Sequence, residues 1–278
     1  RDVERSRGLG DVYKRQGTFP YDGTEKSVKG YDVSITQGST YTEADFTFSG
    51  NDEVKGTEAN TYPMGLKVSD FTNNNTNYSS VTFVVNDGSL VINPKSIIPD
   101  GPDTPDEKKT GIEVTDPEGS IYDGLPHVNP LKVTDTKTGK ELEENKDYTL
   151  SYSKDVINAG TVTVTITGKG NYSQETTVDY QITPRTVKLT SGSDSKTYDG
   201  TPLVKHNVTP SEDGFVMDDG ATYEFTGSQT NVGESDNTFT YALKDGTLAS
   251  NYIITTEAGK LTAVSYTHLR AHETSLHL

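Results

Sequence analysis

The residues that could carry out chemistry are few in this chain, and two histidines are the first to consider. His268 and His272 are four residues apart with Glu273 beside them, the spacing of a metal-binding pair on one face of a helix. They lie in a C-terminal segment whose sequence, VSYTHLRAHET, resembles a translated sequencing adapter. We therefore expect residues 265–278 to be non-native and assign them no metal site.

Nucleophilic or acid–base catalysis needs a nucleophile beside a base, or a pair of poised acids. The chain has no Cys, and the histidines before residue 265, His127 and His206, stand alone without a GxSxG turn. The carboxylates are numerous but scattered. Two groups of aspartates could offer oxygen ligands to calcium: Asp213, Asp218 and Asp219, and Asp100, Asp103 and Asp106. Neither has the spacing of an EF-hand loop. We expect no enzymatic activity, no cofactor and no metal site.

The composition is typical of several small β modules rather than of one large core. Only 30% of the 278 residues are hydrophobic, which is too few for a single extensive core. The net charge of −16 repels phosphate groups, so we expect no binding to nucleic acid and no docking on anionic lipid. No apolar run reaches the length of a membrane span, and we expect no membrane insertion.

An internal repeat is the strongest signal in the sequence. A Tyr-Asp-Gly triplet occurs three times, and each copy is followed 49 to 56 residues later by an Asn-Tyr pair. The repeated residues are Tyr21, Asp22, Gly23, Asn77 and Tyr78; Tyr122, Asp123, Gly124, Asn171 and Tyr172; and Tyr198, Asp199, Gly200, Asn251 and Tyr252. We therefore divide the chain into three related modules, which we expect to be monomeric.

Changes in composition set the expected boundaries. Residues 1–16 carry five Lys or Arg in an otherwise acidic chain and, like residues 265–278, resemble adapter-derived sequence of a metagenomic fragment. The modules span residues 17–97, 111–184 and 185–264, and the Pro- and acid-rich residues 98–110 form a spacer. Ile112–Thr115 and Thr186–Thr190 are predicted first strands. We expect the first module to lack its native counterpart and Asp11–Arg15 to pair in its place.

Strand periodicity predicts an all-β fold. Thr161–Thr167 alternates, with Val162, Val164 and Ile166 on one face and threonines on the other. The same alternation is expected at Tyr148, Leu150 and Tyr152; Val178, Tyr180 and Ile182; Val81, Phe83 and Val85; Leu90 and Ile92; and Tyr223, Phe225, Phe239, Tyr241, Leu243, Tyr252 and Ile254. A strand with one buried face and one solvent-exposed face is typical of antiparallel sheets. We expect three tandem small antiparallel modules, each an immunoglobulin-like sandwich, with a β-grasp-like sheet as the alternative. Residues 63–71 could hold one helical turn at most.

The Tyr-Asp-Gly triplet has the composition of a tight turn. Its Asp can accept local backbone N–H bonds, its Gly can adopt positive φ, and its Tyr can bury the ring while the hydroxyl stays wet or bonded. A ligand-facing tyrosine is the functional alternative. Because the triplet occurs once in each module at the same place, we assign it to the fold. The Asn-Tyr pairs, Asn158-Ala159-Gly160 and Asn231-Val232-Gly233 are interpreted similarly as loop residues with a core anchor.

Two stretches carry a family resemblance. YDGLPH…KVTDTKTGKELEENKDYTLSYSKDVINAGTVTVTITGKGNY…YQITP resembles the immunoglobulin-like repeats of bacterial surface proteins. KTYDGTPL…TNVGESDNTFTYALKDGTLASNYIITTEAGKLT resembles MBG/YDG-type domains that occur in tandem in large adhesins. The resemblance covers about residues 18–263 and says little about a ligand. Some surface domains of this kind carry a Lys–Asn isopeptide crosslink, for which Lys188 and Asn251 are candidates by position, although no acid can be assigned as its catalyst.

The resemblance implies an extracellular location, either secreted or associated with the cell wall. The expected function is a non-catalytic repeat region of a bacterial cell-surface or secreted protein, acting as stalk or adhesin modules. Two alternatives stay open: modules that bind mucin or glycans, and accessory modules of a secreted glycan-degrading enzyme. The expected partner, if the modules bind one, is a host or extracellular glycan or protein.

Overall fold

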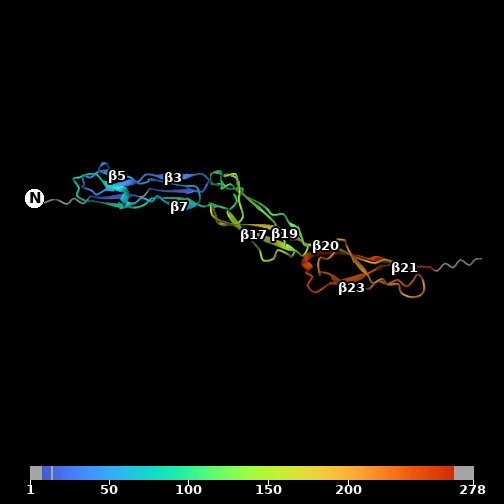
Figure 1. The fold of residues 1–278 in the computed structure, drawn as a ribbon. Helices are drawn as coiled ribbons and strands as arrows, with labels where there is room; N and C mark the ends of the chain where they lie inside the picture. The colour runs from blue at the N-terminus through green and yellow to red at the C-terminus, as the bar shows by residue number, and fades with distance from the viewer. Residues whose placement is uncertain (1–7, 14, 266–278) are drawn as a thin grey trace, which may run out of the picture. The chain divides into compact units, whose positions relative to one another are not determined.

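The computed structural model describes residues 8–13 and 15–265, with side chains from Arg15 onward. Over these residues the protein is all-β, as predicted (Figure 1). The helical segments in this range are four single turns of 3-10 helix: η1 (Glu43–Asp45), η2 (Val68–Asp70), η3 (Asp106–Lys108) and η4 (Ala249–Asn251). The short turn expected within residues 63–71 is η2. No helix in the described range is long and apolar enough to cross a membrane.

The chain forms two compact units. Unit one comprises the described residues up to Asp116 together with Leu131–Ser151 and Val164–Val178. Unit two comprises Pro117–Pro130, Tyr152–Thr163 and the described residues from Asp179 onward. The contacts described below between the first and second predicted modules therefore lie within unit one, and those between the second and third within unit two. The three-module division itself stays a prediction.

The first predicted module is built from small sheets that give a sandwich-like arrangement. Two three-stranded sheets have the orders β4-β1-β9 and β2-β10-β7, and two further pairs are β3-β6 and β5-β8. An aromatic cluster around Tyr41, Phe46 and Phe71 forms a core of this module. The strands are β1 (Gly8–Tyr13), β2 (Gln16–Pro20), β3 (Lys26–Lys29), β4 (Asp32–Ile35), β5 (Phe46–Phe48), β6 (Glu53–Gly56), β7 (Asn60–Pro63), β8 (Phe71–Asn73), β9 (Val81–Val85) and β10 (Ser89–Asn93).

The middle of the chain contains sheets of order β11-β18, β12-β14-β15 and β13-β19-β17-β16. Strand β11 pairs parallel with β18, so Lys95 and Ser96, which the sequence placed at the end of the first module, pair with a strand of the second. The strands are β11 (Lys95–Ser96), β12 (Ile112–Thr115), β13 (Ser120–Ile121), β14 (Lys132–Asp135), β15 (Lys140–Glu141), β16 (Tyr148–Tyr152), β17 (Gly160–Gly168), β18 (Tyr172–Ser173) and β19 (Glu175–Thr183).

The third predicted module has sheets of order β22-β20-β26, β21-β27-β24 and β23-β25. The strands are β20 (Arg185–Ser191), β21 (Asp194–Thr197), β22 (Val208–Pro210), β23 (Ala221–Phe225), β24 (Gly233–Asn237), β25 (Phe239–Leu243), β26 (Tyr252–Glu257) and β27 (Gly259–Val264). These sheets repeat the two three-stranded sheets of the first module with the same directions of pairing.

One parallel pairing recurs in every module and positions the repeat motif. The strand that ends just before each Tyr-Asp-Gly triplet pairs parallel with a strand at the end of the same module: β2 with β10, β13 with β19 and β21 with β27. A second correspondence, between strands β1 and β20, concerns the N-terminal segment. Strand β1 pairs antiparallel with β4 and parallel with β9, as β20 does with β22 and β26. Gly8–Tyr13 thus occupies the place where we expected the adapter-like residues to pair.

Burial agrees with most of the predicted strand faces. Val162, Val164 and Ile166 are each at most 1% exposed, and Leu90 and Ile92 are also buried. An exception lies in the third module, where Tyr241 is 39% exposed. Its strand β25 pairs only with β23 in a two-stranded sheet, and alternation within a strand cannot reveal whether another layer covers the apolar face.

Candidate functional site

The three Tyr-Asp-Gly turns attach to their modules in the same way. In each copy the backbone N–H of the tyrosine donates to a carbonyl at the end of the last strand, which fixes the turn beside that strand. The pairs are Tyr21 to Asn93 at 2.9 Å, Tyr122 to Thr183 at 2.9 Å and Tyr198 to Val264 at 2.8 Å. The parallel strand pairs described above bring these groups together, because they hold the preceding strand in register with the last one.

The Asp and Gly of each triplet close a local turn. Asp22, Asp123 and Asp199 each accept, through Oδ1, the backbone N–H two residues later at 2.9 Å. The three glycines have φ of +78°, +81° and +80°, a region that favours glycine. A hydrogen bond from Lys26 contributes most to lowering the pKa of Asp22 to about 2. The Asp22 carboxylate is therefore an ionised acceptor at neutral pH.

In unit two the tyrosine of one triplet packs against the Asn-Tyr pair of the next module. The rings of Tyr122 and Tyr252 are 5.5 Å apart and perpendicular, at 85°. Both hydroxyls donate to the same oxygen, Oδ2 of Asp219, at 3.0 and 2.6 Å. Burial, reinforced by this carboxylate, raises the pKa of both tyrosines. The hydroxyls thus remain protonated donors at neutral pH.

Asn251 completes this contact by satisfying backbone groups of the preceding module. Its Oδ1 accepts the backbone N–H of Ala159 at 2.9 Å, and its Nδ2 donates to Oδ1 of Asn158 at 2.9 Å. The side chain is buried, and its residue is only 1% exposed. A buried amide with both ends bonded contributes favourably, whereas one that loses a partner is costly. Asn251 therefore acts as a polar bridge between the second and third modules.

Unit one contains the same arrangement between the first and second modules. The rings of Tyr21 and Tyr172 are 5.7 Å apart at 75°, and the Tyr172 hydroxyl donates to Oδ2 of Asp135 at 3.1 Å. Asn171 accepts the backbone N–H of Ala59 at 2.7 Å and donates through Nδ2 to the Glu58 carboxylate. We call this repeated arrangement the joint. One module contributes a Tyr-Asp-Gly turn and a backbone N–H group. The next module contributes an Asn-Tyr pair, whose Asn side chain accepts that N–H, and a nearby carboxylate.

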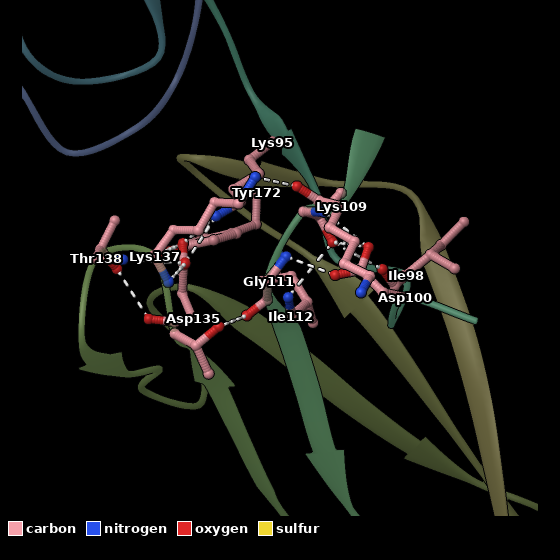
Figure 2. A network of polar contacts seen from close by, with 12 residues as sticks. Lys95, Ile98, Asp100, Lys109, Gly111, Ile112, Asp135, Lys137, Thr138 and Tyr172 are labelled. Carbon is pink, nitrogen blue, oxygen red and sulfur yellow. Dashed lines mark hydrogen bonds and ion pairs between the residues drawn. The ribbon is translucent and has the colours of Figure 1, made fainter. Parts of the chain in front are cut away.

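A buried ion pair anchors the first joint (Figure 2). Asp135 is fully buried and accepts Lys95 Nζ at 2.7 Å on both oxygens, in addition to the Tyr172 hydroxyl. Its Oδ1 also accepts the backbone N–H groups of Lys137 and Thr138 at 3.1 and 3.3 Å. A buried carboxylate needs this number of donors to compensate for its lost hydration. The network therefore fixes the position of the tyrosine at the joint.

The glycine of each joined triplet also lies against the following module. A Cβ added at Gly23 would be 3.1 Å from Cγ2 of Thr138, and one added at Gly124 would be 2.9 Å from Sδ of Met217. Each of these contacts is closer than ordinary van der Waals contact, so the neighbouring side chain would have to shift. The glycine thus serves both the turn and the approach of the next module.

The first Asn-Tyr pair and the third Tyr-Asp-Gly triplet have no such partner module among the described residues. In the first module Tyr78 packs on Tyr41 at 5.1 Å, its hydroxyl is 2.6 Å from Thr40 Oγ1, and Asn77 is exposed. In the third module Tyr198 is 45% exposed, compared with 8% for Tyr21 and 7% for Tyr122. The structure therefore brings together two of the three Tyr-Asp-Gly triplets with two of the three Asn-Tyr pairs.

The other residues that the sequence singled out lie apart from one another. Nε2 of His127 is 3.0 Å from Oδ1 of Asp123, and His206 stacks on Phe225 at 5.1 Å. Among the described residues, no group of three or more His, Asp or Glu side chains is placed to hold a metal ion. Asp219 accepts tyrosine hydroxyls. Asp100, in the spacer, accepts the backbone N–H groups of Thr110 and Gly111 (Figure 2). His268, His272 and Glu273 lie outside the described residues.

The structure does not bring the proposed isopeptide partners together. Lys188 forms an ion pair with Glu257, and the Asn251 amide bonds to Asn158 and Ala159. The crosslink considered from sequence position is therefore not supported by this geometry. No protein-family model matches the chain, and a search of curated proteins found no match either.

Sequence reasoning found the motif residues but assigned them to the fold of a single module. It missed three of the residues that receive them, namely Ala59, Asp135 and Met217, and it considered Asp219 only as an oxygen ligand for calcium. Ala159 was noted only as part of a loop. A signal existed in the position of Ala159, which directly precedes β17 as Ala59 precedes β7, and each of these strands neighbours the last strand of its module. No repeated sequence pattern marks the two carboxylates, because Asp135 is the last residue of strand β14 whereas Asp219 lies in the loop before β23.

Proposed function

We propose that this chain is a non-catalytic repeat region of a bacterial cell-surface or secreted protein, in which immunoglobulin-like β modules form a stalk or adhesin. The observation that carries the proposal is the joint, which is built twice from the same residue types at the same positions of the repeat. A motif used to attach each module to the next serves the spacing of modules. This role requires no reacting group.

The chemistry of the joint supports a fixed connection. Each joint combines a perpendicular ring pair, an amide that bonds to a backbone N–H, and a carboxylate that accepts a tyrosine hydroxyl. In tandem repeats, such contacts add a nearest-neighbour term to the stability of each module. Because the amide bonds are directional, they limit rotation about the connection more than apolar contacts of equal area would. The modules at each joint should therefore bend little relative to each other.

The strand order supports a role under mechanical tension. In the third module, strands near its beginning pair parallel with strands near its end, over six residue pairs between β20 and β26 and four between β21 and β27. Tension that pulls the two ends of such a module apart slides parallel neighbours along each other and loads their hydrogen bonds together. The corresponding contacts of the second module have two residue pairs each: β13–β19, and β18 with β11, the strand that the sequence placed at the end of the first module. The second module should therefore be mechanically the weaker of the two.

Two measurements test the stalk. Small-angle scattering should give a radius of gyration well above the roughly 19 Å expected for a compact globule of 278 residues. Single-molecule pulling should show separate unfolding events, with the second module opening at lower force than the third. A particle near 19 Å, or one whose modules all open at low force without resolved events, would contradict the proposal. Binding to glycans and a role beside a catalytic domain rest on the sequence resemblance alone.

A further inference from the structure

The third Tyr-Asp-Gly triplet has the local geometry of the two joined copies. The Tyr198 N–H donates to the Val264 carbonyl, and Asp199 accepts the Thr201 N–H at 2.9 Å. Gly200 has φ of +80°. The turn is thus already formed in the shape that the other two present to a following module. Local folding of the third module alone accounts for this shape, since no joint is present there within the described part of the chain.

The surface around this turn is open where the other two are covered. Tyr198 is 45% exposed, and a Cβ added at Gly200 would meet no described atom within 4 Å. Val232 occupies the position of Ala59 and Ala159: it directly precedes β24, as they precede β7 and β17, and each of these strands neighbours the last strand of its module. Val232 is 55% exposed, and over the described residues its backbone N–H donates no hydrogen bond. The tyrosine, the glycine and the backbone N–H that are covered or bonded by the next module at the two joints are therefore exposed or without a described partner here.

We propose that the face formed by Tyr198, Gly200, Asn231 and Val232 binds the Asn-Tyr edge of a further β module of this kind. The Asn amide oxygen of that module would accept the Val232 N–H, and its Nδ2 would donate to the Asn231 side chain, as Asn251 does with Asn158. The ring of its Tyr would pack perpendicular to Tyr198. This inference rests on the role proposed above for the joint.

The chain itself defines how the partner can be supplied for a test. In both joints the residue whose carbonyl accepts the tyrosine N–H is followed directly by proline, as Asn93-Pro94 and Thr183-Pro184. A copy of residues 94–184 inserted between Val264 and Ser265 would therefore place an Asn-Tyr module beside the open face. All residues of the present chain are retained, and the insert contains no second copy of Val232.

Hydrogen exchange at the Val232 amide, measured in the present and the extended chain, reports the predicted bond. We expect its exchange to slow by roughly tenfold or more when the inserted module docks, as for a new hydrogen bond of ordinary strength. The matched control is the extended chain with Asn171→Ala in the inserted copy only, which should restore fast exchange. Nitration of Tyr198 should also fall in the extended chain and recover in the control.

A second extended chain guards against failure of one insert to fold. It carries a copy of residues 184–264 with Val232→Ala in the copy, so that only the original Val232 is read. Fast Val232 exchange in both extended chains would overturn the inference. Hydrogen exchange at the Ala59 amide of the first joint distinguishes failure of the docking inference from failure of the proposed joint. Ala59 occurs only once in the first extended chain, so its exchange can be read without ambiguity. If Ala59 is protected and Val232 is not, the docking inference alone fails. If Ala59 is also unprotected, the joint itself fails.

Discussion

Asn251→Ala is the sharpest test of the joint, because one side chain spans two modules without being part of either turn. The substitution removes the acceptor of the Ala159 N–H and the donor to Asn158, each at 2.9 Å. It leaves the backbone of η4 intact, since the Asn251 N–H bonds to the Leu248 carbonyl. The Tyr122–Tyr252 ring contact also remains. The change therefore isolates the polar bridge.

The expected cost follows from the two lost bonds. A hydrogen bond contributes about 0.5–1.5 kcal/mol net, and a buried group left without a partner adds to that. Two bonds of this kind at a side chain that is 1% exposed give about 2 kcal/mol. This corresponds to a roughly 30-fold shift in the equilibrium between closed and open joint. The loss should appear in the coupling between the second and third modules and not within either one.

Asn77→Ala provides the matched control, because Asn77 occupies the same repeat position and is exposed. We expect it to change stability by less than about 0.5 kcal/mol. Guanidinium unfolding followed by tyrosine fluorescence should show the second and third modules separating into distinct transitions in Asn251→Ala only. Exchange of nearby amides that keep their hydrogen bonds should also accelerate. Equal effects of the two substitutions would refute the reasoning, since they would show that the bridge contributes nothing.

Three further outcomes follow from the same contacts. Tyr122→Ala should destabilise the chain by about 3 kcal/mol, whereas Tyr198→Ala should cost about 1 kcal/mol or less, because the first ring is 7% and the second 45% exposed; comparable thermal midpoints would contradict this. Asp135→Ala should cost about 3–5 kcal/mol by leaving a buried lysine unpaired, while Asp106→Ala in an exposed pair should cost under about 1 kcal/mol, both measured by chemical unfolding. The pKa of Tyr252 is higher in the folded chain than in the unfolded chain, so its protonated hydroxyl stabilises the fold. This contribution is complete below the unfolded pKa of about 10 and is lost as pH rises through the folded pKa. Stability should therefore fall above about pH 10 and fall less steeply in Tyr252→Phe, and parallel pH profiles would count against burial of that hydroxyl.

The sequence predicted the β class and most buried faces because these depend on short-range patterns. Val162, Val164 and Ile166 alternate with threonines, and that alternation is sufficient to define one buried face. The Tyr-Asp-Gly turn was likewise readable, because the Asp bond and the positive φ of Gly involve neighbouring residues only. Tyr241 marks the limit of this reasoning, since its exposure depends on whether a second layer covers β25.

Tertiary structure decided where the motif residues act. Tyr122 and Tyr252 are 130 positions apart, and Asn251 reaches a backbone N–H 92 positions away. Nothing in local spacing determines such contacts, because they require the parallel pairing of strands from the two ends of a module. The sequence by itself determined that the repeat has a turn and an anchor. The folded chain determined that the turn of one module meets the anchor of the next, because only packing brings a carboxylate to the tyrosine hydroxyl and a backbone N–H to the Asn side chain.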